Sequence, residues 1–364
     1  MLSFIIFLIV LGTLVFVHEL GHFLLAKKAG VKVEEFGFGY PPRALKIGKK
    51  WGTLFTLNWI PFGGFVKILG ENYEADEIGN VEGKSFTQVS KKWQAAILAA
   101  GVTFNIIFAW LLFSLGFMIG LPTSVENSFG GVVKNPVLTI TELSPGSPAQ
   151  KIGLKTGDKI INIFNNEGVD IGNLNAENVS NFINNSTGKF SIKIDRGGQI
   201  LSFSPEPKAG LVEGRKIIGI GMDMVGTLSL SLPKAFYEGG KTTLKISYLT
   251  VTGLGNLVGE AFRGKANISE VSGPVGIIGL VGDASKLGFA YLITFMALIS
   301  INLAVINLVP FPALDGGRIL FVAIEGITKK KINPKIAGTL NMVGFALLIV
   351  IMVIVTYRDI LRLF

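Results

Sequence analysis

The stretch Leu2–Leu25, which reads LSFIIFLIVLGTLVFVHELGHFLL, is apolar except for the segment His18-Glu19-Leu20-Gly21-His22 near its end. At roughly 20 residues it is long enough to cross a bilayer. It contains both histidines of the chain, and their spacing of four places the two imidazoles on one face of a helix, where they can bind one metal ion. Glu19 can accept a proton from water at that metal, which is the chemistry of a zinc peptidase. The stretch therefore predicts a zinc site inside a membrane.

Two other interpretations of this stretch are weaker. The polar residues could be coincidental and satisfied by neighbouring helices, but burying ionisable groups in hydrocarbon costs roughly 2–3 kcal/mol or more per charge, so such groups are functional by default. A signal peptide would need a basic leading region and a small-residue cleavage site, and would not carry a charged cluster inside its apolar part.

The composition is that of a membrane protein. Mean hydropathy is +0.54, 49% of residues are hydrophobic and 16% are charged. The absence of cysteine excludes disulfides, thiolate zinc sites and cysteine nucleophiles, so any metal must bind histidine and carboxylate. The net charge of +9 arises from lysines beside apolar stretches, which indicates membrane orientation and anionic lipid, and no nucleic-acid partner.

Four apolar stretches predict a multi-span α-helical membrane protein with transmembrane helices at about Leu2–Leu25, Trp93–Ile119, Phe289–Val309 and Ile336–Val355. Lysine and arginine are concentrated between the first two spans and before the fourth, so we expect these segments to be cytoplasmic and residues 121–288 to lie outside the cytoplasm. The site would then lie toward the cytoplasmic side of the inner (cytoplasmic) membrane.

The exterior block predicts a β-rich domain followed by an amphipathic helix. Val137–Thr141 alternates as a strand, Ser144–Ala149 is a turn-rich helix start, Ile152–Ile163 contains a Gly-Asp turn before another strand, and Phe190–Phe203 reads as a hairpin. Further on, apolar residues at three- and four-residue intervals predict a helix that lies on the outer membrane surface or packs against the spans: Leu244, Tyr248, Val251, Leu254, Val258 and Phe262. The expected regions are 1–120, 121–225, 226–288 and 289–364.

The third span ends in Asn307–Gly317, which reads NLVPFPALDGG. Its prolines break the helix, and irregular backbone at membrane depth is tolerated where it lines a protein cavity. A zinc ion held by two histidines needs a further protein ligand, for which Asp315 is the candidate. The alternative role of Asp315 is a salt bridge to Arg318. Asn307 could bond a neighbouring helix or hold substrate backbone.

Between the first two spans, Leu54–Asn58 and Phe65–Leu69 flank Pro61–Gly64, which predicts an apolar hairpin. A free strand edge at the site could pair with an unwound substrate through Phe65, Val66 and Ile68. This matters because a helical substrate hides its peptide bonds in its own hydrogen-bond ladder. The alternative is a soluble cytoplasmic hairpin.

The two separated motifs resemble those of the site-2 proteases: His18–His22 resembles their HExxH, and Asn307–Gly317 resembles their NxxPxPxLDGG. The block from Val137 resembles a bacterial PDZ domain, the alternative being a plain β-rich spacer. With Gly273–Ile277, these features make nearly the whole chain similar to the bacterial RseP-like zinc metalloproteases. The sequence departs from this group in two ways. It has room for a single PDZ module where well-known members have two, which we expect to affect gating, and Gly101–Asn105 lacks its usual proline, which we expect to affect helix packing. We expect neither departure to alter the chemistry.

The resemblance implies a Zn2+ ion held by His18, His22 and Asp315, with Glu19 as catalytic base and Asn307 contacting substrate. It implies a membrane-dipping hairpin, and single-span membrane-protein substrates such as anti-sigma factors or signal-peptide remnants. The PDZ module would bind an extended peptide or a C-terminus by strand addition. We therefore expect an intramembrane zinc endopeptidase. The alternative is a non-catalytic membrane scaffold or a transporter, although a transporter would be expected to show paired inverted repeats, and none is evident.

Overall fold

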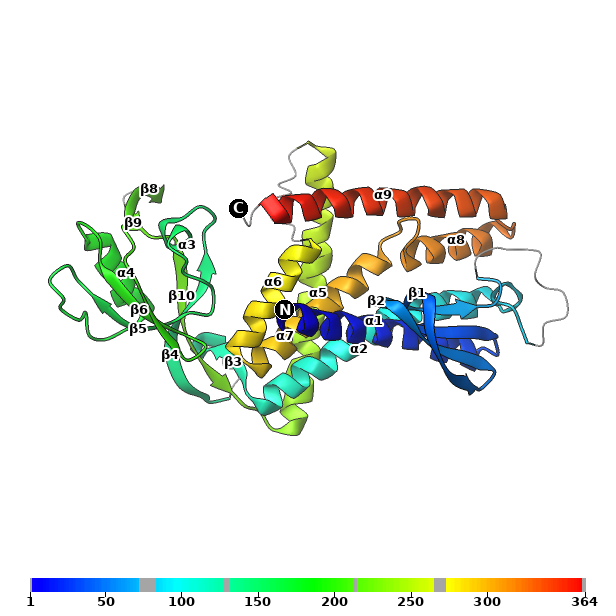
Figure 1. The fold of residues 1–364 in the computed structure, drawn as a ribbon, viewed down its shortest axis with the longest axis horizontal. Helices are drawn as coiled ribbons and strands as arrows, with labels where there is room; N and C mark the ends of the chain where they lie inside the picture. The colour runs from blue at the N-terminus through cyan, green and yellow to red at the C-terminus, as the bar shows by residue number, and fades with distance from the viewer. Residues whose placement is uncertain (1, 72–82, 128–130, 213–214, 265–272, 362–364) are drawn as a thin grey trace. The chain divides into compact units, whose positions relative to one another are not determined.

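A computed structural model describes residues 2–71, 83–127, 131–212, 215–264 and 273–361 (Figure 1). Within these ranges four helices are long and apolar enough to cross a membrane: α1 (Leu2–Lys28), α2 (Lys91–Ile119), α7 (Phe289–Leu308) and α9 (Pro334–Leu361). Each coincides with a predicted span. The described part of the chain therefore contains four candidate membrane-spanning helices where the sequence predicts spans.

The chain divides into two compact units, each built from discontinuous segments. The first comprises residues 1–113, 239–285 and 293–364, and the second comprises residues 114–238 and 286–292. The four spans belong wholly or largely to the first unit, together with α8 (Asp315–Thr328) and most of α5 (Leu232–Phe262) and α6 (Pro274–Leu287).

Helices α1 and α2 of the first unit approach each other closely at a glycine. A Cβ added at Gly21 would lie 2.5 Å from the carbonyl oxygen of Ala100, so a larger residue could not occupy this crossing. At the other end of the chain, Gly276 of the motif Gly273–Ile277 donates its amide to the buried carboxylate of Asp359 in α9, at 2.7 Å. This contact ties the start of α6 to the end of the fourth span.

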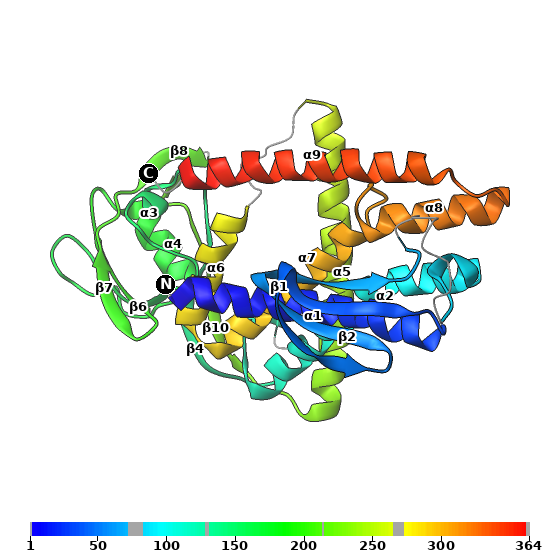
Figure 2. The same cartoon turned by 45° about the vertical axis from the view of Figure 1, so that its right-hand side comes forward.

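The predicted amphipathic segment forms most of α5, which runs across the direction of α1 and α9 in both views (Figures 1 and 2). It contacts the spans through small and polar residues: Gly240 lies against Trp110 of α2, and the Thr250 hydroxyl lies 3.4 Å from the Asn302 side-chain oxygen of α7. Its exposed apolar residues include Leu244, Tyr248, Val251 and Val258. The helix therefore contacts the spans and still presents an apolar stripe.

Two long strands, β1 (Val33–Lys50) and β2 (Thr53–Ile68), lie between α1 and α2 in the sequence. The predicted position of the hairpin turn, Pro61–Gly64, is wrong: these residues lie inside β2, and the chain reverses at Trp51 and Gly52, both with positive φ. Both strands bend, so that Phe36 lies opposite Val66 on one side and Phe55 on the other. The two predicted strands are thus parts of one bent strand, each paired with β1.

The second unit is built on an antiparallel six-stranded sheet of order β3-β10-β4-β5-β6-β7. Its strands are β3 (Leu121–Ser124), β4 (Val133–Leu143), β5 (Lys159–Phe164), β6 (Ser191–Arg196), β7 (Gln199–Phe203) and β10 (Ile220–Leu228), and β8 (Lys208–Val212) pairs with β9 (Arg215–Ile217) separately. The predicted strand at Val137–Thr141 lies in β4, and the predicted hairpin is β6–β7. The β-rich character is confirmed, and the PDZ identity stays a prediction.

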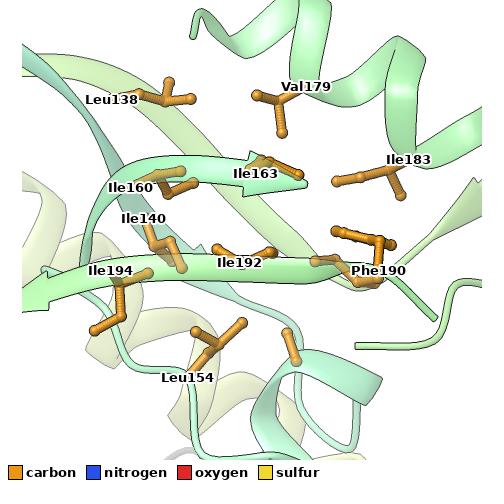
Figure 3. Close-up of a cluster of buried hydrophobic side chains, with 12 residues drawn as sticks. Leu138, Ile140, Leu154, Ile160, Ile163, Val179, Ile183, Phe190, Ile192 and Ile194 are labelled. Carbon is orange, nitrogen blue, oxygen red and sulfur yellow. The ribbon is translucent and has the colours of Figure 1, made fainter. Parts of the chain in front are cut away.

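Buried aliphatic side chains hold this sheet against two helices, α3 (Pro148–Lys151) and α4 (Ala176–Asn185). Ile160 and Ile163 of β5 and Ile192 of β6 share one core with Val179 and Ile183 of α4 (Figure 3). The Gly-Asp turn before β5 is fixed separately, because the buried Asp158 carboxylate accepts two hydrogen bonds from Arg196, at 2.6 and 2.7 Å.

Candidate metal centre

Helix α1 brings the two histidines together on one face, as their spacing predicts. The side chains of His18 and His22 are buried, and their Nε2 atoms lie 3.2 Å apart. The Nδ1 atom of His22 lies 2.8 Å from the carbonyl oxygen of Ile97 in α2. Because a carbonyl only accepts, Nδ1 carries the proton and Nε2 presents a lone pair.

The broken segment between α7 and α8 carries the third candidate ligand. Gly316 and Gly317 allow it to fold tightly: added Cβ atoms would lie 2.3 Å from the carbonyl oxygen of Leu308 and 2.2 Å from that of Phe311, respectively. Asp315 is the first residue of α8. The turn just before it places the Ala313 backbone at a φ of 75°.

The fourth span holds this turn in place. The side-chain oxygen of Asn341 in α9 accepts a hydrogen bond from the Ala313 amide at 3.2 Å, and Gly344 lies against the carbonyl of Pro312. Strained backbone persists only where surrounding contacts fix it. Helix α9 therefore fixes the segment that carries Asp315.

Three ligand atoms from these elements converge on one point. Asp315 Oδ2 lies 3.0 Å from His18 Nε2 and 3.3 Å from His22 Nε2. This oxygen is buried and has no hydrogen-bond donor in the described part of the chain. The ligand atoms of a tetrahedral zinc site lie roughly 3.3–3.6 Å apart, given metal–ligand distances of about 2.0–2.2 Å. The separations and the unsatisfied oxygen fit a zinc ion held by His18, His22 and Asp315.

A buried asparagine contacts His18 from the second span. The side chain of Asn105 in α2 lies against Nδ1 of His18 with Nδ2 at 3.3 Å, and its Oδ1 has no partner among the described residues. With the amide turned by 180°, Oδ1 of Asn105 accepts the proton on His18 Nδ1, which leaves His18 Nε2 free for metal. The Ser300 hydroxyl of α7 donates a hydrogen bond to the backbone carbonyl of Asn105 at 2.8 Å, which fixes α2 at this position.

The segment Gly101–Asn105, which stands out in the sequence only for its missing proline, also contacts the two histidines. Besides Asn105, Gly101 lies directly against the ligands: a Cβ added there would be 2.4 Å from His22 Nε2 and 2.7 Å from His18 Nε2. The sequence signal for Asn105 is a carboxamide side chain in the middle of an apolar span, since strongly polar residues there tend to face the interior and to be functional.

Replacing Asn105 with alanine should weaken zinc binding by about 10- to 100-fold, because His18 loses the acceptor that orients its ring. Competition against a chelator of known affinity measures this loss. Thr103→Ala is the matched control, because Thr103 lies on the same helix and donates to the Ala99 carbonyl at 2.8 Å. An equal loss in both variants, or no loss in Asn105→Ala, would contradict the contact with His18.

Glu19 lies beside strand β2. Its side chain is half-buried, and a Cβ added at Gly64 would lie 3.6 Å from Glu19 Cγ. The backbone amide of Val66 interacts with the Glu19 carboxylate. The base candidate is therefore adjacent both to the ligands on α1 and to the backbone of β2.

The remaining predicted site residues lie at varying depth. Phe65 and Val66 are half-buried, while the Ile68 side chain is buried in a core cluster with Phe23, Phe36 and others. Asn307 is half-buried near the end of α7. Arg318 binds Glu71, so this arginine has an acidic partner other than Asp315.

Two imidazoles and a carboxylate that converge on one point, next to a glutamate and on a bundle of membrane-spanning helices, are the parts of a membrane-embedded zinc peptidase. Comparison with known proteins gives the same class. The profile of Peptidase family M50 matches residues 6–351. The chain belongs to this family, that of the site-2 proteases.

Named relatives extend over nearly the full length of this chain. A putative zinc metalloprotease of Clostridium acetobutylicum is 34% identical, with 98% of this chain and 97% of the relative covered. The zinc metalloprotease RasP of Geobacillus kaustophilus is 31% identical, with 100% and 98% covered, and the regulator of sigma-W protease RasP of Bacillus subtilis is 31% identical, with 98% of each covered. The protein is therefore a zinc metalloprotease with Zn2+ as its cofactor, which decides against the scaffold and transporter alternatives.

Proposed function

We propose that this protein is an intramembrane endopeptidase that cleaves the transmembrane segments of single-span membrane proteins. The observation that carries the proposal is the convergence of His18, His22 and Asp315, with the two histidines on a helix long enough to span a bilayer. Substrate bonds that reach this point must come from within or beside the bilayer. In this role the three residues are the zinc ligands, and Glu19 is the catalytic base.

When bound, zinc supplies Lewis-acid activation of water and of the scissile carbonyl. Glu19 accepts the proton from the attacking water and then donates it to the leaving amine. Asn105 and the Ile97 carbonyl hold the imidazoles of His18 and His22 in one orientation. The Asp315 carboxylate balances positive charge within the bundle.

The free edge of β2 presents the substrate to Glu19. In the described part of the chain, residues 64–68 are paired with β1 along one side, and the Val66 amide interacts with Glu19. An unwound segment of substrate can add to this edge as a further strand, which exposes its peptide bonds. Phe65 and Val66 contribute side-chain and backbone contacts, and Ile68 contributes backbone only, because its side chain is buried. Asn307 binds substrate backbone nearby.

Residues 121–288 lie outside the cytoplasm, and the site faces the cytoplasmic side of the cell membrane. The basis is the concentration of lysine and arginine between α1 and α2 and before α9. The exposed stripe on α5 and its direction across α1 suit a helix on the outer membrane surface (Figure 2). The β-rich unit acts as a PDZ module that binds an extended peptide or C-terminus.

Introduced cysteines test this orientation, because the parent has none. Asn173→Cys should react with a membrane-impermeant thiol reagent in intact cells, whereas Lys330→Cys should react only after lysis. Both positions are exposed, so accessibility within the fold does not bias the comparison. The reverse labelling pattern would place the β-rich unit in the cytoplasm.

The proposed substrates are single-span proteins shortened beforehand by another protease, such as anti-sigma factors, or signal-peptide remnants. The name of the Bacillus subtilis relative, regulator of sigma-W protease, supports the first group. The direct test is co-expression with a tagged single-span protein whose exterior domain has been removed. The parent should release a cytoplasmic fragment, and its Glu19→Gln variant should not.

A further inference from the structure

Two ion pairs hold helix α8 through the same helical face. Arg318 binds Glu71, and Glu325 binds Lys91 at the start of α2. The two α8 residues are seven positions apart, which places them on one side of a helix. Asp315 lies three positions before Arg318, within the same turn. The first ion pair is therefore close to the zinc ligand, and the second is two turns further away.

Glu71 lies in the turn just past the end of strand β2 (Thr53–Ile68). The Glu71 amide donates to the Ile68 carbonyl at 3.3 Å, and the Leu69 amide donates to the Lys32 backbone carbonyl at 3.0 Å. The Leu69 carbonyl accepts from Phe86 at 2.8 Å. These bonds fix the backbone around Glu71 to the sheet. A shift of the Glu71 side chain would therefore also move the edge formed by residues 64–68.

The edge strand is consequently attached to the catalytic groups near both ends. Near its start, Gly64 lies beside Glu19 of α1, since a Cβ added to Gly64 would be 3.6 Å from Glu19 Cγ, and the Val66 amide interacts with the Glu19 carboxylate. Just past its end, Glu71 binds Arg318 of α8, one turn from Asp315. The strand therefore cannot slide relative to the metal ligands without breaking one of these contacts.

The pair is suited to fixing geometry more than to adding stability. The Arg318 and Glu71 side chains are 26% and 14% exposed, so both charges are partly removed from water. For such pairs the desolvation cost offsets much of the attraction, while loss of one partner leaves an uncompensated charge. The planar guanidinium of an arginine can form two parallel hydrogen bonds to a carboxylate. It therefore fixes the relative orientation of the two side chains better than the ammonium group of a lysine does.

We propose that Arg318 and Glu71 are positioning residues that set the register between the edge strand and the zinc ligands, and so determine which substrate bond reaches Glu19. The proposal rests on the proposed function, in which the substrate adds to this edge. Breaking the ion pair leaves the edge strand and the zinc ligands intact, but the strand is then displaced relative to the ligands. A displacement of about 1 Å can cost roughly 100-fold in rate, so kcat should fall more than KM changes, and cleavage should spread over neighbouring bonds.

A distance measurement tests the proposal without any substrate. Spin labels on Lys67→Cys, in the edge strand, and Ile327→Cys, on α8, are both at exposed positions in a chain that has no other cysteine. Pulsed electron paramagnetic resonance should give a narrow distance distribution in the parent and a broader or shifted one in Glu71→Gln. Glu35→Gln is the matched control, because Glu35 binds Arg43 and Thr56 within the sheet and should leave the distribution unchanged. An unchanged distribution in Glu71→Gln overturns the proposal.

Cleavage assays provide the second readout. Arg318→Gln and Glu71→Gln should retain stoichiometric zinc, lose about 10- to 100-fold in kcat and yield extra cleavage positions by mass spectrometry. The reciprocal exchange, Arg318→Glu with Glu71→Arg, should recover a single position and most of the rate. Loss of zinc in the single variants, or a reciprocal variant no better than either, overturns the proposal. A parent that cleaves no single-span protein refutes the proposed function instead, and the distance measurement still decides the role of the pair.

Discussion

The Glu19→Gln variant is expected to bind stoichiometric zinc and yet release no detectable fragment from a single-span test substrate. Glutamine keeps the size of the side chain but cannot accept a proton, and positioned acid–base groups contribute roughly 10²- to 10⁴-fold to rate. Zinc is retained because the three converging ligand atoms belong to other residues. Metal analysis of the purified variant and immunoblotting of the tagged substrate measure the two effects.

Asp315→Ala provides the contrast, because it removes a ligand and should lose zinc together with cleavage. Both variants should be compared at matched expression. Continued cleavage by Glu19→Gln would remove Glu19 from the catalytic role. A parent protein that purifies without zinc would contradict the assignment of the metal site.

Gly101→Ala should abolish zinc binding and activity together, although only one methyl group is added. That methyl would lie 2.4 Å from His22 Nε2 and 2.6 Å from His18 Cε1, so either the imidazoles or helix α2 must move. Overpacking of a close-packed site costs about 1–3 kcal/mol and displaces neighbouring side chains. Here the displaced atoms are the metal-binding ones. Metal analysis and the cleavage assay on purified protein measure the outcome.

Gly338→Ala is the matched control for this substitution. Gly338 also lies in a spanning helix, but a Cβ added there meets nothing within 4 Å. It should keep zinc and activity, because alanine is the better helix former and no contact is disturbed. If Gly101→Ala also remained zinc-loaded and active, the close contact between α2 and the imidazoles would be wrong.

The spans and the candidate ligand residues could be identified from the sequence because their signals are local. The apolar length of α1 and the spacing of His18 and His22 need no knowledge of the rest of the fold. Asp315 could be proposed because it is a carboxylate beside helix-breaking prolines and glycines. The alternating strands of the β-rich unit are local signals too.

Contacts between distant segments could not be predicted in this way. Periodicity identifies strands but not which turn joins them, so the sequence predicts a turn at Pro61–Gly64, within β2, whereas the chain reverses at Trp51 and Gly52. The contact between Asn105 and His18 depends on how α1 crosses α2. The partner of Arg318 depends on where the sheet meets α8, and nothing near Arg318 in the sequence identifies Glu71.

The proposed zinc ligands come from distant parts of the sequence, and this has a consequence for biosynthesis. A ribosome that adds about 5–20 residues per second needs roughly 15–60 s between His22 and Asp315. During that interval the first helix can already be in the bilayer. The donor set is incomplete until α8 has been made, so the nascent enzyme lacks the means to hydrolyse its neighbours or its own later spans. If these three residues bind the zinc, their order along the chain delays the onset of proteolysis until synthesis is nearly complete.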